Sequence, residues 1–179
     1  IDSYFLREAD FPAGVDFLMM GTPVETIVPL TQAFLPKLEA GLIVSDVGSV
    51  KGEIVRGMEK LLPKKVSFVA GHPIAGSEQW GAQAARPNLF VRHRTVLTPT
   101  KRTDQNALRK VVKLWRKVGA DVEIMHPDVH DRVLGVISHL PHVLVYALVN
   151  ALERSHLKGV DLNSYCAGGF KDFTRIASS

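Results

Sequence analysis

The amino-acid sequence predicts an α/β fold with a mostly parallel sheet, followed by the start of an all-helical domain. From residue 16 to residue 125, short apolar runs alternate with helix-periodic segments, which is typical of a parallel sheet covered by helices. At His126-Pro127 the alternation stops, and a long apolar stripe with helical spacing follows without another strand. We therefore predict one domain over residues 1–126 and a second over residues 127–179.

The strands of the first domain are predicted where short apolar runs end at turn-forming residues, at 16–20, 42–44, 66–70, 95–97 and 121–125. Helical spacing between the runs predicts helices over about 24–38, 50–62 and 104–118. Pro29 and Pro36 make the first of these helices imperfect, because proline removes a backbone donor. Thr103 is the expected cap of the third helix, and Gly119 follows its end.

The second domain begins with one long helix, predicted from Val129 to Leu152 by a wide apolar stripe. Pro127 falls in its first turn, where a missing N–H costs little. Pro141 falls inside it, and a kink is expected there because no amide can bond back to Ile137.

Composition excludes several classes of protein. The net charge of +4 comes from dispersed basic residues without interleaved aromatics, which argues against nucleic-acid binding and fits an anionic small substrate equally well. The single cysteine, Cys166, excludes an internal disulfide and fits a reducing, cytoplasmic location. No apolar run of membrane-spanning length and no signal-peptide pattern is recognised, so no membrane partner is expected. The opening Ile1-Asp2-Ser3 lacks a methionine, and we expect the chain to be the middle of a longer one.

Three polar motifs each follow an apolar run directly: "GTP" at 21–23, "DVGSVK" at 46–51 and "AGHPIAGSE" at 70–78. The carboxyl ends of parallel strands meet at one edge of a sheet, where ligands of open α/β sheets bind. Thr22, Ser49 and His72 are therefore expected to share one crevice. Taken singly, each has a simpler interpretation: Thr22 lies in a turn, Ser49 caps the helix that begins at Val50, and His72 is bonded to backbone.

The helical domain adds further candidates. His139 and His142 lie one turn apart, as do His126 and His130, and such pairs can ligate a metal. No third ligand stands at a recognisable spacing, so no metal site is predicted. Arg175 lies between apolar residues near the end, where it is either a solvated helix charge or a guanidinium that binds a carboxylate.

Four motifs in order carry a family resemblance: "DVGSVKG", "GHPIAGSE", "HDRVLGVISHLPH" and "GGFKDFTRIA". From about Val15 onward the chain resembles the prephenate dehydrogenases, also called cyclohexadienyl or arogenate dehydrogenases, of tyrosine biosynthesis. The resemblance implies a partial Rossmann-type domain followed by a helical domain that forms a homodimer. It also implies oxidative decarboxylation of prephenate (or arogenate) to 4-hydroxyphenylpyruvate (or tyrosine), with NAD or NADP as the cofactor.

The resemblance further implies roles for individual residues. His72 would be the catalytic histidine, which engages the 4-hydroxyl of the substrate ring. Ser49 would hydrogen-bond near His72 and the nicotinamide, and Arg175 would bind a substrate carboxylate. The remaining implied residues are Glu78 and His142 lining the substrate pocket, His139 and Asp131 in the same polar network, and Thr22, Pro23 and Val24 along the dinucleotide.

The chain departs from the family pattern in one respect. The G-x-G-x-x-G fingerprint and the ribose-binding acid are absent and are expected before Ile1, and the remaining dimer helices are expected after Ser179. Two alternatives therefore stay open. One is a β-hydroxyacid dehydrogenase with Lys171 as its catalytic lysine, although this leaves "GHPIAGSE" unexplained. The other is a non-catalytic regulatory fragment that binds an aromatic amino acid and dimerises.

Overall fold

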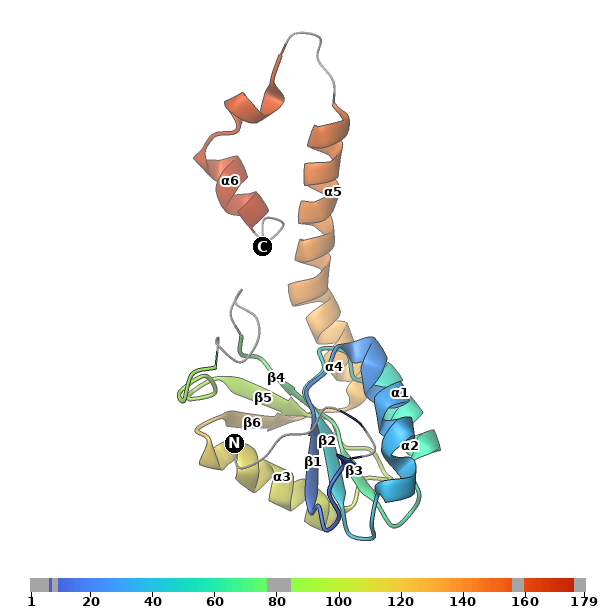
Figure 1. The fold of residues 1–179 in the computed structure, drawn as a ribbon. Helices are drawn as coiled ribbons and strands as arrows, with labels where there is room; N and C mark the ends of the chain where they lie inside the picture. The colour runs from blue at the N-terminus through green and yellow to red at the C-terminus, as the bar shows by residue number, and fades with distance from the viewer. Residues whose placement is uncertain (1–6, 8–9, 77–84, 156–159, 176–179) are drawn as a thin grey trace. The chain divides into compact units, whose positions relative to one another are not determined.

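The computed structural model describes Arg7 and residues 10–76, 85–155 and 160–175. The chain divides into two compact units, Ile1–Asp131 and Arg132–Ser179. Strands and helices alternate in the first unit, and the described part of the second is helical, which confirms the predicted fold class (Figure 1).

The described part of the first unit contains two three-stranded sheets. The strands β1 (Phe17–Met20), β2 (Ile43–Asp46) and β3 (Ser67–Val69) form a parallel sheet in that order. The second sheet consists of β4 (Gly71–Pro73), β5 (Arg94–Leu97) and β6 (Asp121–Ile124). The chain passes from one sheet to the other at Ala70, whose carbonyl accepts a hydrogen bond from the Thr98 amide at 3.0 Å.

The strand β4 was not expected, because its motif was interpreted as a loop. β4 pairs antiparallel with β5, which in turn runs parallel to β6, and His72 lies opposite Val96. Glycine and proline are both depleted in strands, so three residues that include Gly71 and Pro73 carry no strand signal. The backbone of His72 is therefore fixed by sheet pairing rather than by a turn.

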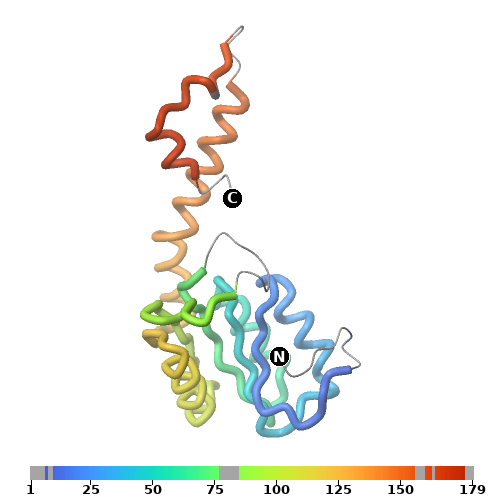
Figure 2. Tube along the Cα trace, turned by 60° about the vertical axis from the view of Figure 1, so that its left-hand side comes forward, coloured from blue at the N-terminus to red at the C-terminus, as the bar shows by residue number. Residues whose placement is uncertain are grey.

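Helices cover both faces of the first sheet (Figures 1 and 2). Successive strand side chains point to opposite faces, so Val44 packs with Ile27 and Met58 while Ile43 packs with Trp115. The helices that supply these partners are α1 (Val24–Phe34) and α2 (Gly52–Leu61) on one face and α3 (Gln105–Lys117) on the other. Each fully buried side chain of this size stabilises the fold by about 1.5–3 kcal/mol.

The helix ends differ in detail from the predicted ones. The first helix ends at Phe34, and a 3-10 turn, η2 (Leu35–Lys37), accommodates Pro36. The cap of α3 is Asp104 rather than Thr103, since the Asp104 carboxylate accepts the Ala107 amide at 2.8 Å. The Thr103 hydroxyl instead accepts the amide of Thr100 at 2.9 Å. Gly119 follows the helix with a φ of 87°, as predicted for a glycine at this position.

The helical run Pro127–Arg154 begins in the last residues of the first unit and continues through the second. It consists of α4 (Pro127–Leu134), the π-helical turn η4 (Gly135–His139) and α5 (Leu140–Arg154). The amide of Leu140 bonds to the carbonyl of Gly135, five residues earlier. The helix therefore accommodates Pro141 by a wider, π-helical turn, where a kink was expected. The 3-10 turn η5 (Leu162–Tyr165) and the helix α6 (Gly168–Thr174) follow.

The same helical run exposes an apolar stripe, whose members include Val136, Ile137, Leu140, Val143 and Leu144. Its 28 residues are long and apolar enough to cross a membrane, by length and composition alone. The prediction that the chain has no apolar run of membrane-spanning length is therefore wrong, and it missed this run because polar residues and two prolines interrupt the stripe. Only 11% of its most apolar window is buried, so the stripe requires a cover of some kind.

Candidate functional site

The carboxyl ends of β1, β2 and β3 form the edge where the sequence analysis placed the site. The register pairs Met20 with Asp46, and Ser45 with Val69, so Thr22, Ser49 and His72 all follow the same edge. Ser49 is exposed and precedes the helix rather than capping it, because α2 begins at Gly52 with Lys51 as its N-cap residue. The capping interpretation of Ser49 is therefore wrong.

His72 takes part in a series of side-chain hydrogen bonds that the sequence did not predict. Its Nδ1 lies 2.9 Å from Nε2 of His130, and Nδ1 of His130 lies 2.8 Å from Oδ1 of Asp131. The His130 side chain is completely buried, while His72 is half-buried. We call Asp131, His130 and His72 the histidine series.

The carboxylate of Asp131 is fixed at the beginning of α2. Its Oδ1 accepts the backbone amide of Lys51 and its Oδ2 that of Gly52, both at 2.8 Å. Asp131 therefore caps a helix 79 residues earlier in the chain. A Cβ atom on Gly52 would lie 2.9 Å from Oδ2, so a side chain at this position would displace the carboxylate.

Burial and hydrogen bonding set the protonation states of the series. Burial lowers the pKa of His130 below its ordinary value, although its contact with Asp131 acts in the opposite direction. Burial acts to raise the pKa of Asp131, but the amides of Lys51 and Gly52 and the His130 ring lower it overall. At neutral pH the series therefore holds an ionised carboxylate and a neutral His130.

These protonation states assign the tautomers. A carboxylate only accepts hydrogen bonds, so Nδ1–H of His130 donates to Asp131. The neutral ring of His130 then has an acceptor at Nε2, and Nδ1–H of His72 donates to it. The lone pair of a neutral His72 ring is consequently at Nε2, on the side of the ring away from this hydrogen bond.

A buried ion pair lies next to the series. Lys51 and Asp46 have fully buried side chains and contact each other through Nζ and Oδ2. Nζ also donates to the carbonyl of Gly71 at 2.6 Å, one residue before His72. Oδ1 of Asp46 accepts the Gly71 amide at 3.2 Å. The sequence does not indicate that Lys51 is buried, because lysine is almost never fully buried unless it is paired.

Asp131 was predicted as a member of the polar network, whereas His130 was missed and left only a weak signal in the sequence. His130 and Asp131 open the motif "HDRVLGVISHLPH", but His130 was considered only as a possible partner of His126 for a metal. The His126 ring instead lies 3.6 Å from the Asp128 carboxylate. Among the residues that the structure describes, no group of three or more histidine, cysteine or acidic side chains could hold a metal ion.

Three of the predicted substrate residues belong to the second unit. His139 and His142 are exposed on η4 and α5, and Arg175 directly follows α6. The His142 ring donates from Nδ1 to the carbonyl of Ser138 at 2.8 Å, which leaves Nε2 as the acceptor of a neutral ring. Glu78 lies outside the described residues.

The predicted cofactor residues lie at the beginning of α1. Pro23 is the N-cap residue and Val24 the first residue of this helix. The hydroxyl of Thr22 is buried and has no hydrogen-bond partner among the described residues. A buried hydroxyl without a partner is costly, so this atom fits a polar group of a bound ligand.

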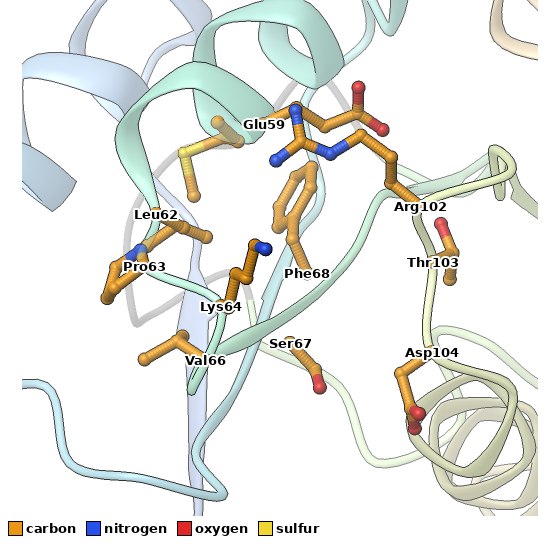
Figure 3. A pocket seen from close by; sticks show the side chains of 11 residues that line it. Glu59, Leu62, Pro63, Lys64, Val66, Ser67, Phe68, Arg102, Thr103 and Asp104 are labelled. Carbon is orange, nitrogen blue, oxygen red and sulfur yellow. The ribbon is translucent and has the colours of Figure 1, made fainter.

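A pocket of about 250 Å³ lies elsewhere, at the opposite end of β3. Figure 3 shows its Phe68 ring between the side chains of Lys64 and Arg102. None of its lining residues belongs to the histidine series or to the predicted cofactor residues. This hollow is therefore distinct from the candidate site.

A helix-covered sheet with a fixed histidine at its carboxyl edge, followed by a helical segment, defines a class of α/β ligand-binding proteins. Comparison with family models is more specific. Residues 7–124 match the nucleotide-binding domain of prephenate dehydrogenase, and residues 126–179 match its dimerization domain. The chain belongs to the prephenate dehydrogenase family, which confirms the resemblance.

Individual relatives agree with this assignment. The prephenate dehydrogenase of Bacillus subtilis is 39% identical over 163 residues, covering 90% of this chain and 44% of the relative. The cyclohexadienyl dehydrogenase of Zymomonas mobilis is 33% identical over 165 residues, covering 92% of this chain and 56% of the relative. The chain thus spans about half the length of the curated relatives it matches.

Two solved structures are similar in fold. The prephenate dehydrogenase of A. aeolicus, in complex with hydroxyphenyl propionate and NAD+, is 46% identical with a TM-score of 0.86. That match covers 92% of this chain and 57% of the other. The arogenate dehydrogenase of Synechocystis is 31% identical with a TM-score of 0.78, covering 93% of this chain and 59% of the other.

Proposed function

We propose that the protein catalyses the NAD(P)-dependent oxidative decarboxylation of prephenate or arogenate, as a step of tyrosine biosynthesis. The observation that carries the proposal is the histidine series, which gives His72 a defined tautomer at the ligand-binding edge of the sheet. Family membership supplies the reaction class. It disfavours both the β-hydroxyacid dehydrogenase and the non-catalytic fragment as alternatives.

His72 is the proposed base. Its Nε2 takes the proton of the substrate's 4-hydroxyl as hydride leaves C4 of the ring. The resulting dienone loses CO2, and the electrons of the broken C–C bond aromatise the ring and leave a phenolate oxygen. His72 returns its proton to that oxygen, so no net proton is released.

The remainder of the series positions this base. Asp131 holds the tautomer of His130, and His130 holds that of His72, over hydrogen bonds of 2.8 and 2.9 Å. As His72 becomes positively charged, its Nδ1–H bond to His130 strengthens, because a charged donor makes a stronger hydrogen bond. The series therefore favours the state in which His72 has accepted the proton.

The cofactor residues pass a simple test of fit. Thr22 contributes a buried hydroxyl without a partner among the described residues, as expected of a group that binds a polar ligand. We propose that Thr22, Pro23, Val24 and Ser49 hold NAD, or alternatively NADP. When bound, the nicotinamide supplies the hydride acceptor.

The substrate residues are proposed mainly on chemical grounds. Arg175 binds a substrate carboxylate, which the planar guanidinium matches with two parallel hydrogen bonds. His142 offers Nε2 as an acceptor, because its Nδ1–H is bonded to Ser138. We propose that Glu78, His139 and Asp131 complete the polar surroundings of the substrate.

The apolar stripe of Pro127–Arg154 supports a homodimer. Its length alone would also fit a membrane span, but residues 126–179 match a dimerization domain. We propose that a second copy of the helical domain covers the stripe and that the protein acts in the cytoplasm without a membrane or nucleic-acid partner. We also propose residue 126 as the boundary between the two domains.

The test is an assay of the protein expressed from its complete reading frame. Prephenate and arogenate are each offered with NAD+ and with NADP+, and reduced nicotinamide and CO2 are measured. Equal amounts of both products with at least one substrate are expected. Formation of reduced nicotinamide without CO2, or no turnover with either substrate, would contradict the proposal.

A further inference from the structure

Lys51 is a fully buried lysine that the proposed reaction does not use. Its Nζ contacts Asp46 and donates to the carbonyl of Gly71, the residue before His72. Its backbone amide donates to Asp131, at the far end of the histidine series. One residue therefore holds both ends of the series, through its side chain at one end and its backbone at the other.

The Lys51 side chain contacts the backbone at Gly71, where two strands lie close together. A Cβ atom on Gly71 would lie 3.1 Å from the backbone oxygen of Asp46, so the two strands approach closely here. At the preceding residue, Ala70, the chain leaves the first sheet for the second. Lys51 thus holds the backbone at the first residue of β4, directly before His72.

A purely structural role is the simpler interpretation of this pair. Buried ion pairs, however, contribute little net stability, because the cost of desolvating both charges offsets their attraction. Burial lowers the pKa of Lys51 and raises that of Asp46, while their mutual attraction opposes both shifts. An apolar pair of similar volume would fill the same space, so stability does not explain the lysine.

We propose that Lys51 is a positioning residue for His72, which it places through the Gly71 carbonyl on one side and through Asp131 and His130 on the other. The catalytic part of this inference rests on the proposed role of His72 as the base. The geometric part does not, because the hydrogen bonds of the series exist without substrate.

Lys51 also acts on the series through its charge. The charged groups that act on His130 are Asp131, Lys51 and Asp46, and its ring also contacts His72. The Lys51 charge lowers the pKa of His130, whereas both carboxylates raise it. A protonated His130 would donate from Nε2 and compete with His72, so the Lys51 charge keeps the series functional at lower pH.

The variants separate geometry from charge. Lys51→Met removes both the contact with Gly71 and the charge. Asp46→Asn combined with Lys51→Met also removes the opposing charge, so the net charge of the pair stays the same. Lys51→Gln keeps an amide NH2 group, but its side chain is shorter than that of lysine and does not reach both partners. This variant carries the test if the methionine variants do not fold. Lys60→Met, at an exposed position of α2, is the matched control.

The first measurement is the 15N–15N coupling across the hydrogen bond between His72 and His130 in the protein expressed from its complete reading frame. We expect the coupling in the unmodified chain and in Lys60→Met, and its loss in folded variants at Lys51. A coupling that persists in those variants would overturn the inference. No coupling in the unmodified chain would refute the histidine series itself.

The second measurement is steady-state kinetics of the same variants in the protein from the complete reading frame. We expect kcat to fall by about 10- to 100-fold in Lys51→Met and in the double variant, with a smaller change in KM, as for a misplaced catalytic group. The acid limb of the kcat/KM profile should move to higher pH in Lys51→Met and less in the double variant. Unchanged kcat would overturn the positioning role, whereas an inactive parent with an intact coupling would refute only the proposed function.

Discussion

The surroundings of His72 and the long helix Pro127–Arg154 represent two different ways of building a site. Around His72, each polar group is held by another group of the same unit, and His130, Lys51 and Asp46 are fully buried. On the long helix, apolar side chains such as Ile137 and Val143 are exposed, and so is His142. The proposed base is thus held by other groups of its own unit, whereas the apolar stripe of the long helix requires a cover.

The largest expected effect tests the surroundings of His72. His72→Asn keeps a hydrogen-bonding side chain but removes the proposed base, so kcat should fall by ~10²–10⁴-fold, the usual contribution of general base catalysis. KM should change little, and steady-state kinetics with saturating NAD+ measures both. His93→Asn, at an exposed position of the same unit, is the control. Near-parental turnover of His72→Asn would remove His72 from the mechanism.

The second expected effect tests the apolar stripe on the helix Pro127–Arg154. If the exposed apolar stripe is the proposed dimer interface, a charge within it, as in Ile137→Asp, should weaken association by about 2–4 kcal/mol, the range of an interface hot spot. Analytical ultracentrifugation measures the dissociation constant, and Asp128→Asn, at an exposed site early in the helix, is the control. An unmodified chain that is monomeric and binds no apolar dye would contradict the dimer.

The third effect compares binding with catalysis. Arg175→Ala should raise KM for prephenate by about 10- to 100-fold with little change in kcat, because a hydrogen bond to a charged group contributes about 1.5–3 kcal/mol in ground and transition states alike. Arg154→Ala, at the exposed end of α5, should leave KM unchanged. Loss of turnover at constant KM would assign Arg175 a different role.

The fourth effect concerns the helix cap. Gly52→Ala places a methyl group 2.9 Å from the Asp131 carboxylate, which should displace it and lower the free energy of unfolding by about 0.5–2 kcal/mol, the usual cost of a lost cap. Urea denaturation measures this change. Gly135→Ala, where an added Cβ meets nothing within 4 Å, is the control. Equal stability of the two variants would mean that Asp131 is not a significant cap.

The smallest effect is a pH dependence of stability. The pKa of His130 is lowered in the folded state, so between its unfolded value of 6.5 and its folded value the unfolded chain binds more protons. The stability contributed by this residue is complete above pH 6.5 and is lost as the pH falls through that window. The urea concentration at the midpoint of unfolding should therefore decrease less on lowering the pH in His130→Gln than in the parent. Parallel curves would show that His130 is not buried in its neutral form.

The sequence predicted the strands and helices that have a periodic apolar pattern. It did not predict the hydrogen bonds between residues that are far apart in the chain. Apolar runs and helical spacing located β1, β2, α1 and α3 to within a few residues, because those signals are local. The location of His72 after a strand followed from the same reasoning. The roles of Ser49, Arg175 and the other substrate and cofactor residues remain predictions.

The contacts of the histidine series are not local. His72 and His130 are separated by 58 residues, and Asp131 caps a helix 79 residues away. No periodicity reports such a pairing, and a buried lysine at position 51 contradicts the ordinary behaviour of its residue type. The strand β4 was missed because sheet pairing overrode the turn preference of Gly71 and Pro73.

The dual role of Asp131 links local unfolding to the integrity of the site. If the first turn of α2 opens, the amides of Lys51 and Gly52 leave the carboxylate, and His130 loses its fixed partner in the same event. Hydrogen exchange at these two amides would therefore report how often the histidine series loses its Asp131 anchor in the native ensemble. A substitution that loosens this turn would reduce activity without touching a catalytic side chain.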